Sequence, residues 1–245
     1  MKKQYGLILI ALALVLISVC VYIAHYLIFH DIHHILIYMM GDLAFLPLEV
    51  LLVGIVVERI LTRREIEEKK SKLNMVISAF YSELGTPLVD MLLKATSQMD
   101  LMIENLNVVS SWKEADFRKA KLFLKNTDLI NFDMINISEL NAFLLSKRGF
   151  LLSLIDNPNV LEHELFSDLL LSVFHLSEEL ESRPSLTNLP ARDRAHINED
   201  IKRANRNLLI QWLDYMKHLQ SNYPYLFSHY LRIHAFQYKP SAVIE

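Results

Sequence analysis

Two long apolar runs near the N-terminus limit what this chain can fold into. Residues 6–29 form a run of 24 positions without Asp, Glu, Lys or Arg, and residues 35–57 form a second run interrupted only by Asp42 and Glu49. At about 1.5 Å rise per residue, an α-helix of either length can span the roughly 30 Å hydrocarbon core of a bilayer. Because residues 30–34 between them provide only a short turn, the sequence predicts a transmembrane helical hairpin.

The first run does not have the form of a cleaved signal peptide. Its apolar stretch is longer than the about 7–15 residues typical of such a peptide, and no small-residue cleavage site precedes a polar mature start. A second apolar run follows at once. We therefore expect the first run to remain in the protein as a transmembrane helix.

Lysine and arginine residues predict the orientation of the hairpin. Lys2 and Lys3 precede the first run, and the turn HDIHH contains neither Lys nor Arg. Six basic residues follow the second run: Arg59, Arg63, Arg64, Lys69, Lys70 and Lys72. Because cytoplasmic flanks of membrane spans carry the excess of Lys and Arg, we expect two spans in the inner (cytoplasmic) cell membrane, with both termini in the cytoplasm.

Charge and cysteine content narrow the classes of partner and cofactor. The basic residues are concentrated next to the predicted membrane, which suits contact with anionic lipid headgroups. The formal net charge of −3 does not suggest a nucleic-acid partner. The single cysteine, Cys20, excludes an intrachain disulfide and a Cys-rich zinc or iron–sulfur site, so no cofactor is predicted on these grounds.

The rest of the chain is predicted to be helical. Apolar positions recur at helical spacing, strand-like alternation is not evident, and only five glycines occur in 245 residues. The predicted fold is therefore all-α, in four parts. They are a transmembrane hairpin (1–61), a helical extension of the second span (62–84), a cytoplasmic helical bundle (85–236) and a tail (237–245).

Glycine, proline and capping residues predict where the first cytoplasmic helices begin and end. We expect the extended second span to end at Gly85, and the next helix to run from Pro87 to Leu106. Ser111 and Glu114 have the spacing of a capping box, which predicts the start of a further helix.

Later boundaries follow in the same way. Gly149 is expected to stop a helix over residues 134–148, and a longer helix should cover residues 159–182. Residues 182–190 read as a linker, and residues 190–221 as a last long helix. An apolar stripe runs along this last helix: Ile197, Ile201, Ala204, Leu208, Trp212, Tyr215 and Leu219.

The second run carries a stripe of polar residues inside the predicted membrane. Asp42 and Glu49 are seven residues apart, which places them on one face of a helix, close to His34 and Tyr38. Pro47 removes a helix hydrogen bond between the two acids and is expected to kink the span. A carboxylate that faces lipid at this depth costs several kcal/mol, so the stripe should face protein or water.

Two interpretations of this stripe remain open. In one, several hairpins surround a path in which rings of Asp42 and Glu49 attract cations or pass protons. In the other, a protonated Glu49 forms a hydrogen bond to the first span or to a neighbouring subunit and stabilises helix packing. Because one hairpin offers only two helices, conduction would require an oligomer.

The turn between the spans offers a second set of candidate residues. His30, Asp31, His33 and His34 provide imidazole and carboxylate groups that suit Zn²⁺, Ni²⁺ or Cu²⁺, and His30 and His34 have i,i+4 spacing if the turn is helical. These histidines could instead lie at the headgroup level of the membrane, or sense pH, since imidazole titrates near neutrality.

Two charged segments of the cytoplasmic part resemble sites but are interpreted as solvated surfaces. A helical wheel places Glu164, Asp168, His175, Glu178 and Glu179 on the face opposite the leucines, whereas a di-iron site in a bundle needs its ligands pointing inward. Residues 192–203 mix both charges and read as a solvated helix face. No phosphate-binding loop, HExxH, GxSxG or kinase motif occurs, so we expect no enzyme.

Three segments carry a resemblance to a known group of proteins. They are FHDIHHILIYMMGDLAFLPLEVLLVGIVVERIL, KLNMVISAFYSELGTPLV and QWLDYMKHLQSNYPYLFS. The chain resembles uncharacterised two-span membrane proteins of bacteria and archaea over nearly its whole length, most strongly over residues 29–89. The resemblance implies two spans with a cytoplasmic helical domain, and it brings no activity and no catalytic residues.

These observations lead to one main functional prediction. We expect a non-enzymatic integral membrane protein that anchors a cytoplasmic helical interaction or sensing module. It should associate with itself through its transmembrane and cytoplasmic helices, and its bundle should bind a protein partner. The alternatives are an oligomeric cation or proton channel lined by Asp42 and Glu49, and a metal or pH sensor that uses the turn His30–His34.

Overall fold

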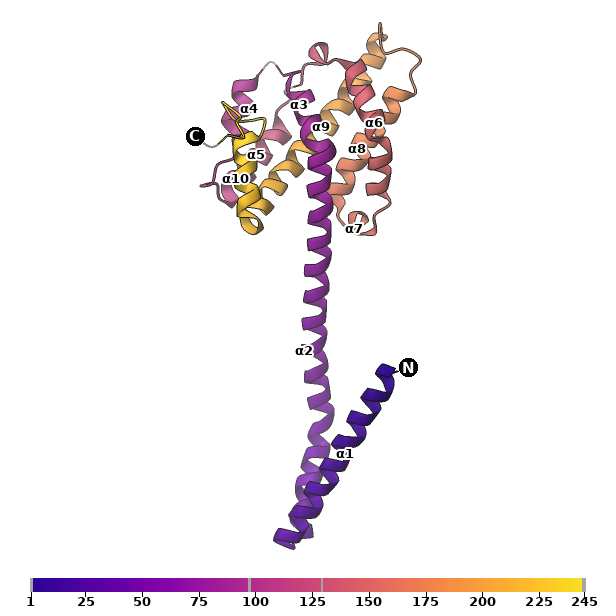
Figure 1. Ribbon diagram of the computed structural model, residues 1–245, viewed down its shortest axis with the longest axis vertical. Helices are drawn as coiled ribbons and strands as arrows, with labels where there is room; N and C mark the ends of the chain where they lie inside the picture. Colours follow the sequence, from indigo (N-terminus) through magenta and orange to yellow (C-terminus); the bar gives the residue numbers. More distant parts are fainter. Residues whose placement is uncertain (1, 97, 129, 244–245) are drawn as a thin grey trace. The chain divides into compact units, whose positions relative to one another are not determined.

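The computed structural model describes residues 2–96, 98–128 and 130–243, with side chains for residue 6 and from residue 9 onward. Its regular structure is helical (Figure 1). The helices are α1 Lys2–Phe29, α2 Ile32–Phe80, a π-helical turn Tyr81–Gly85, α3 Thr86–Leu93, α4 Met99–Leu106, α5 Glu114–Asn126, a 3₁₀ turn Phe132–Met134, α6 Ile137–Ile155, α7 Pro158–Leu161, α8 Glu164–Glu181, α9 Ala191–Asn222 and α10 Pro224–Ile233.

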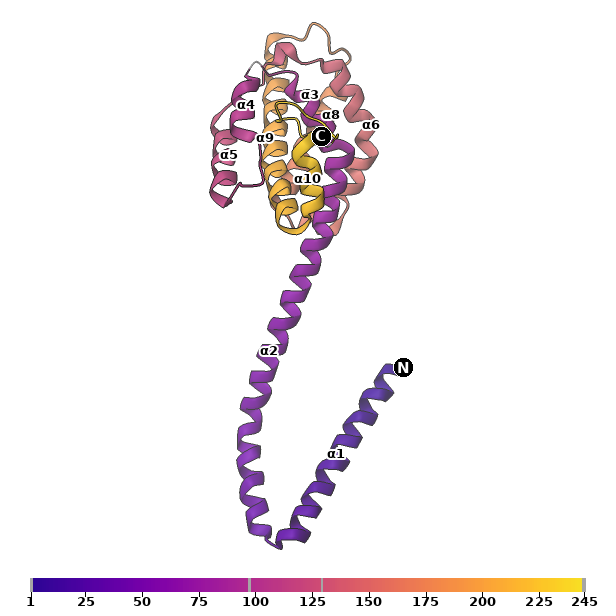
Figure 2. The same cartoon turned by 60° about the vertical axis from the view of Figure 1, so that its left-hand side comes forward.

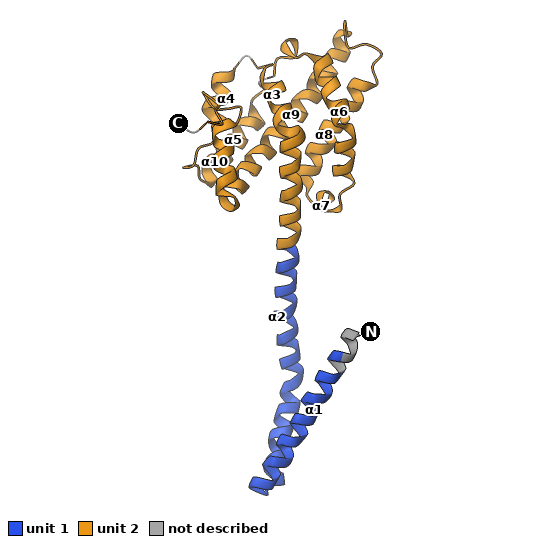
Figure 3. Cartoon of the chain, in the orientation of Figure 1, with its two compact units in different colours: residues 1–66 blue, residues 67–245 orange. Residues whose placement is uncertain are grey.

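The all-α prediction is confirmed. Within the described residues no strand occurs, and the nearest approach to one is an isolated bridge between Thr96 and Ile130. The chain divides into two compact units, residues 1–66 and residues 67–245 (Figure 3).

The first unit consists of α1 and the first part of α2. Figure 2 shows the two helices close together at the turn and diverging from it. Only residues 30 and 31 lie outside the helices, so the turn is shorter than the predicted 30–34. His30 has a φ of 52°, which reverses the chain, and the Asp31 carboxylate accepts a hydrogen bond from the main-chain N–H of His34 (3.1 Å), which caps α2.

Both helices of this unit are long and apolar enough to cross a membrane. Their most apolar windows are not buried at all within the chain, because α1 and α2 cover little of each other's surface. Large side chains such as Leu12, Leu16, Phe45 and Leu46 are each at least half exposed. The apolar surface of this unit therefore lacks a protein cover within one chain.

The second unit has a closed apolar core built around α9. This helix packs against α8 on one side and against α5 and α10 on the other, and α6 covers α8 (Figures 1 and 2). The predicted stripe of α9 lies in this core. Its residues are all buried: Ile197, Ile201, Ala204, Leu208, Trp212, Tyr215 and Leu219. Helical apolar spacing thus identified the central helix correctly.

The end of α2 enters the core through aromatic residues. Phe80 and Tyr81 are completely buried, and the Phe80 ring meets the Phe166 ring of α8 edge-on at 5.4 Å between centroids. The Tyr81 hydroxyl donates a hydrogen bond to the main-chain carbonyl of Leu208 (2.9 Å), and its ring stacks on Tyr215. These contacts join α2 to α8 and α9.

The expected helix break at Gly85 is wrong. Gly85 has helical φ and ψ, and the π-helical turn Tyr81–Gly85 joins α2 to α3. A Cβ atom on Gly85 would lie 2.6 Å from the Tyr81 ring, so glycine serves close packing here and does not terminate a helix. The π-turn also accommodates Pro87, which lacks an N–H group for a regular α-helical bond.

Four other predicted boundaries differ from the structure. The helix predicted from Pro87 to Leu106 is divided into α3 and α4. α5 is not capped by Ser111; the main-chain N–H of Lys113 donates a hydrogen bond to the Asp116 carboxylate instead (2.8 Å). α6 continues through Gly149, around which a Cβ would meet nothing within 4 Å, and residues 162–163 divide α7 from α8. One glycine thus does not end α6, and the other three differences are breaks or caps that the glycine, proline and capping patterns did not predict.

Candidate functional site

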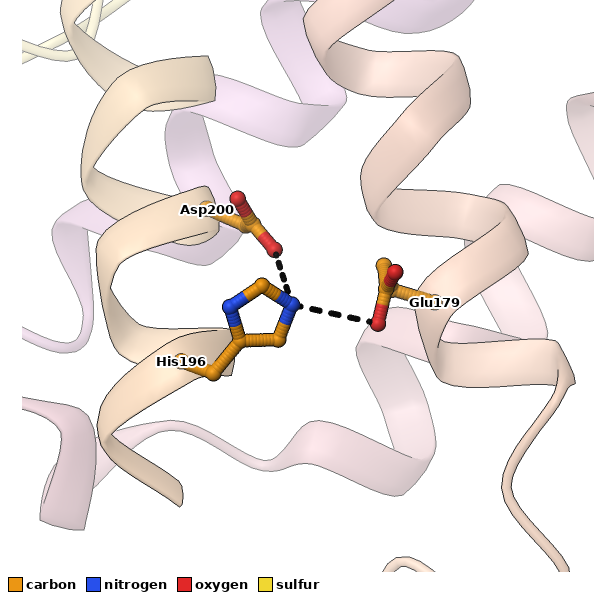
Figure 4. Close-up of side chains that lie close together, drawn as sticks. All are labelled: Glu179, His196 and Asp200. Atoms are coloured by element: carbon orange, nitrogen blue, oxygen red, sulfur yellow. Dashed lines mark ion pairs between the residues drawn. The ribbon is translucent and has the colours of Figure 1, made fainter. Parts of the chain in front are cut away.

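Two packed helices bring four chemically active side chains together. His175 and Glu179 lie one turn apart on α8, and His196 and Asp200 lie one turn apart on α9. Residues at i and i+4 share a helix face, so each helix presents one imidazole and one carboxylate to the same region. Figure 4 shows the imidazole of His196 between the carboxylates of Glu179 and Asp200, with one nitrogen facing both.

The distances show that both imidazoles face the same space. His196 Nε2 lies 3.5 Å from Asp200 Oδ2 and 3.4 Å from Glu179 Oε2. His175 Nε2 lies 3.6 Å from the same oxygen of Asp200 and 3.8 Å from Glu179 Oε1. We refer to these four residues as the α8–α9 cluster.

Asp200 is the most deeply buried residue of the cluster. Its side chain is only 2% exposed, whereas both histidines are about half exposed. Asp200 Oδ1 lies 3.2 Å from Nη1 of Arg203, but Oδ2 accepts no hydrogen bond from the described part of the chain. Buried carboxylate oxygens normally have a partner, so this oxygen requires an explanation.

Arg183 fixes the other carboxylate. Its Nη1 donates to Glu179 Oε2 (2.8 Å) and to the main-chain carbonyl of Glu179, and its Nε and Nη2 bind both oxygens of Asp193 (2.9 and 2.6 Å). The Arg183 hydrogen bond lowers the pKa of Glu179 and that of Asp193. Glu179 is thus ionised at neutral pH and held in one orientation.

The donor set of the cluster suits metal ions. Imidazole nitrogen and carboxylate oxygen are the ligands that Zn²⁺ and related divalent transition metals use in proteins without cysteine. Within the residues that the structure describes, Glu179, His196 and Asp200 are the one group of three whose ligand atoms lie within 4.8 Å of one another.

Sequence reasoning missed this convergence. The interpretation of residues 192–203 as a solvated face is wrong for Asp200, which is buried against α8. On α8, Glu164, Asp168 and Glu178 are exposed as predicted, but Glu179 is half buried and turns toward α9. The available signal was the repeated pair of histidine and acid at i,i+4 on both sides of the linker.

A separate cavity of about 470 Å³ lies between α2 and α9 within the second unit, lined by residues that include Lys70, Asn74, Gln211 and His218. Nε2 of Gln211 and Nε2 of His218 are buried without a hydrogen-bond partner in the described chain. Burial, and then the charge of Lys70, lower the pKa of His218. The cavity therefore offers unused polar groups to a small polar molecule.

The predicted polar stripe lies on the helical surface of α2. The His34 and Tyr38 rings meet edge-on at 4.7 Å, as expected one turn apart. Asp42 and Glu49 are exposed, and neither forms an ion pair or hydrogen bond within the described residues. α2 includes Pro47 without interruption. Any partner of the two acids must come from lipid, water or another chain.

The histidine turn has a different geometry from the α8–α9 cluster. His30 lies outside both helices, so His30 and His34 do not have the helical i,i+4 relation that the metal prediction requires. The Asp31 carboxylate caps α2, and His33 is exposed. A metal site in this turn stays a prediction.

The basic residues after the second span divide between the two units. Three are exposed residues of the first unit: Arg59, Arg63 and Arg64. In the second unit, Lys69 pairs with Glu162 (3.1 Å), Lys72 pairs with Glu68 (4.0 Å), and Lys70 lines the cavity.

Comparison with known proteins matches both parts of the chain to family models. Residues 2–61 match a family model described as the N-terminal helical domain of MJ1433, and residues 69–232 match one described as the C-terminal helical domain of the uncharacterized protein MJ1433. The chain is 41% identical to "Uncharacterized protein MJ1433" of Methanocaldococcus jannaschii over 99% of its own length and 97% of the relative's. No solved structure matches the chain.

The resemblance noted in the sequence is therefore confirmed as a family relationship to helical proteins without an assigned activity. Both family models and the full-length relative agree: the chain belongs to the MJ1433 family.

Proposed function

We propose that the chain is a membrane-anchored, non-enzymatic helical module that senses a ligand or binds a partner in the cytoplasm. α1 and the apolar part of α2 form the anchor, and residues 67–245 form the module. The observation that carries the proposal is that no residue in the most apolar windows of α1 and α2 is buried within the described structure.

Energetics support a lipid environment for these helices. Leaving a large apolar side chain in water costs about 1.5–3 kcal/mol relative to burial, and the first unit exposes such side chains on all sides of both helices. Lipid can cover all sides of a helix at once. Tyr22, Tyr26 and Tyr38, near the turn, suit the headgroup region at one interface.

The second unit supports the sensing or binding role. Its core is closed, so its specific chemistry lies in surface features: the cavity beside Gln211 and His218, and the α8–α9 cluster. Both combine buried polar atoms that lack partners with access from solvent. Such sites bind ligands without requiring a catalytic group.

Fractionation and cysteine labelling test the anchor. The full chain should stay with membranes through high-salt and alkaline washes and should be released by detergent. In a Cys20→Ser background, His33→Cys should react with an impermeant maleimide added outside intact cells. Lys239→Cys should react only after permeabilisation. Release by salt alone, or labelling of Lys239→Cys from outside, would overturn the proposed anchor or its orientation.

An oligomeric cation or proton pathway is the second candidate function. It is favoured by the two acids of α2, Asp42 and Glu49, which have no partner within the described chain. Ion flux into liposomes containing purified protein tests it. Flux that Glu49→Gln removes at equal insertion and oligomer size would support the pathway. Absence of flux in the wild type across several cations and pH gradients would exclude it.

A further inference from the structure

The α8–α9 cluster joins two helices across the linker of residues 182–190. We propose that Glu179, His196 and Asp200 bind one divalent transition-metal ion, with His175 as the candidate fourth ligand and Zn²⁺ as the ion that best matches the donor set. The inference concerns residues 67–245 alone and does not depend on whether the hairpin enters a membrane.

The spacing of three donor atoms supports a tetrahedral site. With zinc–ligand bonds of about 2.0–2.1 Å, the edge of a tetrahedron between two ligand atoms is about 3.3–3.4 Å. His196 Nε2 lies 3.4 Å from Glu179 Oε2 and 3.5 Å from Asp200 Oδ2, close to this edge. His175 Nε2 lies 3.6 Å from the same oxygen of Asp200 but faces the other oxygen of Glu179 at 3.8 Å, and it is outside the group of three whose ligand atoms lie within 4.8 Å of one another. A rotation of the His175 side chain is therefore needed to make it the fourth ligand.

Direct pairing of the residues explains the arrangement less well. A charge-assisted hydrogen bond between imidazole and carboxylate is typically about 2.7–2.9 Å long, and none of the four contacts reaches that range. Both imidazoles face the same oxygen of Asp200, which accepts no hydrogen bond although the residue is almost fully buried. A cation between the groups would satisfy this oxygen and use the nitrogen lone pairs.

The surroundings of the cluster support its carboxylates as ligands. Metal-binding carboxylates are commonly held by outer hydrogen bonds or ion pairs. Arg183 provides this for Glu179, and Arg203 lies beside the outer oxygen of Asp200. With neutral imidazoles, the charges of the two ligand acids, Asp193 and the two arginines sum to −1, which favours a divalent cation.

The partly exposed histidines make the site accessible to an ion from solvent. His175 and His196 are about half exposed, whereas Asp200 is at the base of the cluster, so an ion can approach from solvent without unfolding the bundle. Because α8 and α9 flank the linker, a bound ion would hold the end of one helix to the start of the other. Metal binding should therefore stabilise this part of the second unit.

Metal titration of the full chain in detergent micelles tests the proposal. After treatment with a chelator, the wild type should bind one equivalent of Co²⁺ with the visible absorption of a four-coordinate nitrogen and oxygen site, and Zn²⁺ should displace it. Zn²⁺ should also raise the midpoint temperature of thermal unfolding of the second unit. Asp200→Asn and His196→Gln should each weaken Zn²⁺ binding at least about 10-fold, by analogy with the loss of groups that hold metal ligands.

Matched variants separate this site from others. Glu178→Gln changes a neighbouring acid of α8 that pairs with Arg148, and the double variant His33→Ala/His34→Ala replaces two of the three histidines in residues 30–34. Both variants should bind Zn²⁺ as the wild type does. His196 is 53% exposed, so His196→Gln should fold even if Asp200→Asn does not. The proposal is overturned if the wild type shows no saturable binding, or if His196→Gln leaves binding unchanged. Unchanged binding in His175→Gln would remove that residue from the ligand set.

Discussion

Phe45 and Phe80 lie on the same helix, α2, yet Phe80 is completely buried and Phe45 is 53% exposed. Apart from the polar stripe of α2 and the charged residues 58–65, the helices of the first unit are apolar on all sides, whereas the helices of the second unit have an apolar face and a polar face. A helix with one apolar face can bury it against a neighbouring helix of the same chain. A helix that is apolar all round needs a surrounding apolar phase or other chains.

Charged groups follow the same division. In the second unit, Arg183 holds Glu179 and Asp193, and Lys121 lies 2.5 Å from Asp214. In the first unit, Glu49 has no ion pair within the described chain. Stability measured on the second unit should therefore respond strongly to its own residues and little to those of the hairpin. Both tryptophans, Trp112 and Trp212, belong to the second unit, so their fluorescence reports on it selectively.

The largest expected effect is the loss of a buried aromatic ring. Phe80→Ala should lower the free energy of unfolding by about 3–5 kcal/mol, because it leaves a cavity against Tyr81 and Phe166. Urea unfolding of the full chain in detergent, followed by tryptophan fluorescence, measures this loss of free energy. Phe45→Ala removes the same atoms from the same helix and should change the free energy of unfolding by less than about 0.5 kcal/mol. Equal losses in both variants would contradict the division between the units.

Acid should weaken the second unit through His234. This residue is 3% exposed and packs against Trp212, and burial lowers its pKa to about 4. The unfolded chain takes up a proton near pH 6.5, while the folded chain does not. Stability should therefore be constant above about pH 7 and fall between pH 6.5 and 4, by up to about 3 kcal/mol.

Urea unfolding at a series of pH values measures this loss. His234→Leu should remove this part of the pH dependence, leaving a flatter curve between pH 6.5 and 4. His229→Leu, an exposed histidine of α10, should keep the wild-type slope. An unchanged slope in His234→Leu would contradict the prediction and would show that other groups determine the pH dependence.

An intermediate effect is expected at the π-helical turn. Gly85→Ala places a Cβ 2.6 Å from the Tyr81 ring and should cost about 1–3 kcal/mol through overpacking. Gly54→Ala adds the same methyl group where nothing lies within 4 Å, and alanine favours helix over glycine. In unfolding experiments Gly54→Ala should be neutral or slightly stabilising. If Gly85→Ala were also neutral, the packing of Tyr81 against Gly85 would not be as tight as the structure has it.

The sequence was sufficient to predict the buried face of a helix, which depends on that helix alone. The stripe from Ile197 to Leu219 identified the core face of α9, because helical periodicity is a local property. The sequence was insufficient for helix ends, because a helix can tolerate a residue that favours a stop. α6 continues through Gly149, since a single glycine inside a helix costs only about 1 kcal/mol.

The α8–α9 cluster shows a second limit. A helical wheel places Glu179 opposite the leucines of α8, and the mixed charges of residues 192–203 read as a solvated helix face. The packing of α8 on α9 covers part of it, buries Asp200 and brings the two acids and two histidines together. Such convergence depends on contacts between residues distant in sequence, which the periodicity of either segment does not contain.

The smallest expected effects come from replacing one carboxylate by its amide in each unit. Asp214→Asn removes an ion pair with Lys121 whose two side chains are about one third exposed, so the loss should be about 0.5–1 kcal/mol in urea unfolding. Glu49→Gln should leave the same transition unchanged within about 0.3 kcal/mol, because Glu49 is an exposed residue of the first unit, whereas the transition reports on the second. A clear shift in Glu49→Gln would mean that the hairpin and the second unit unfold as one cooperative structure. Such a shift would favour the interpretation in which Glu49 packs against the first span or a neighbouring subunit over the pathway.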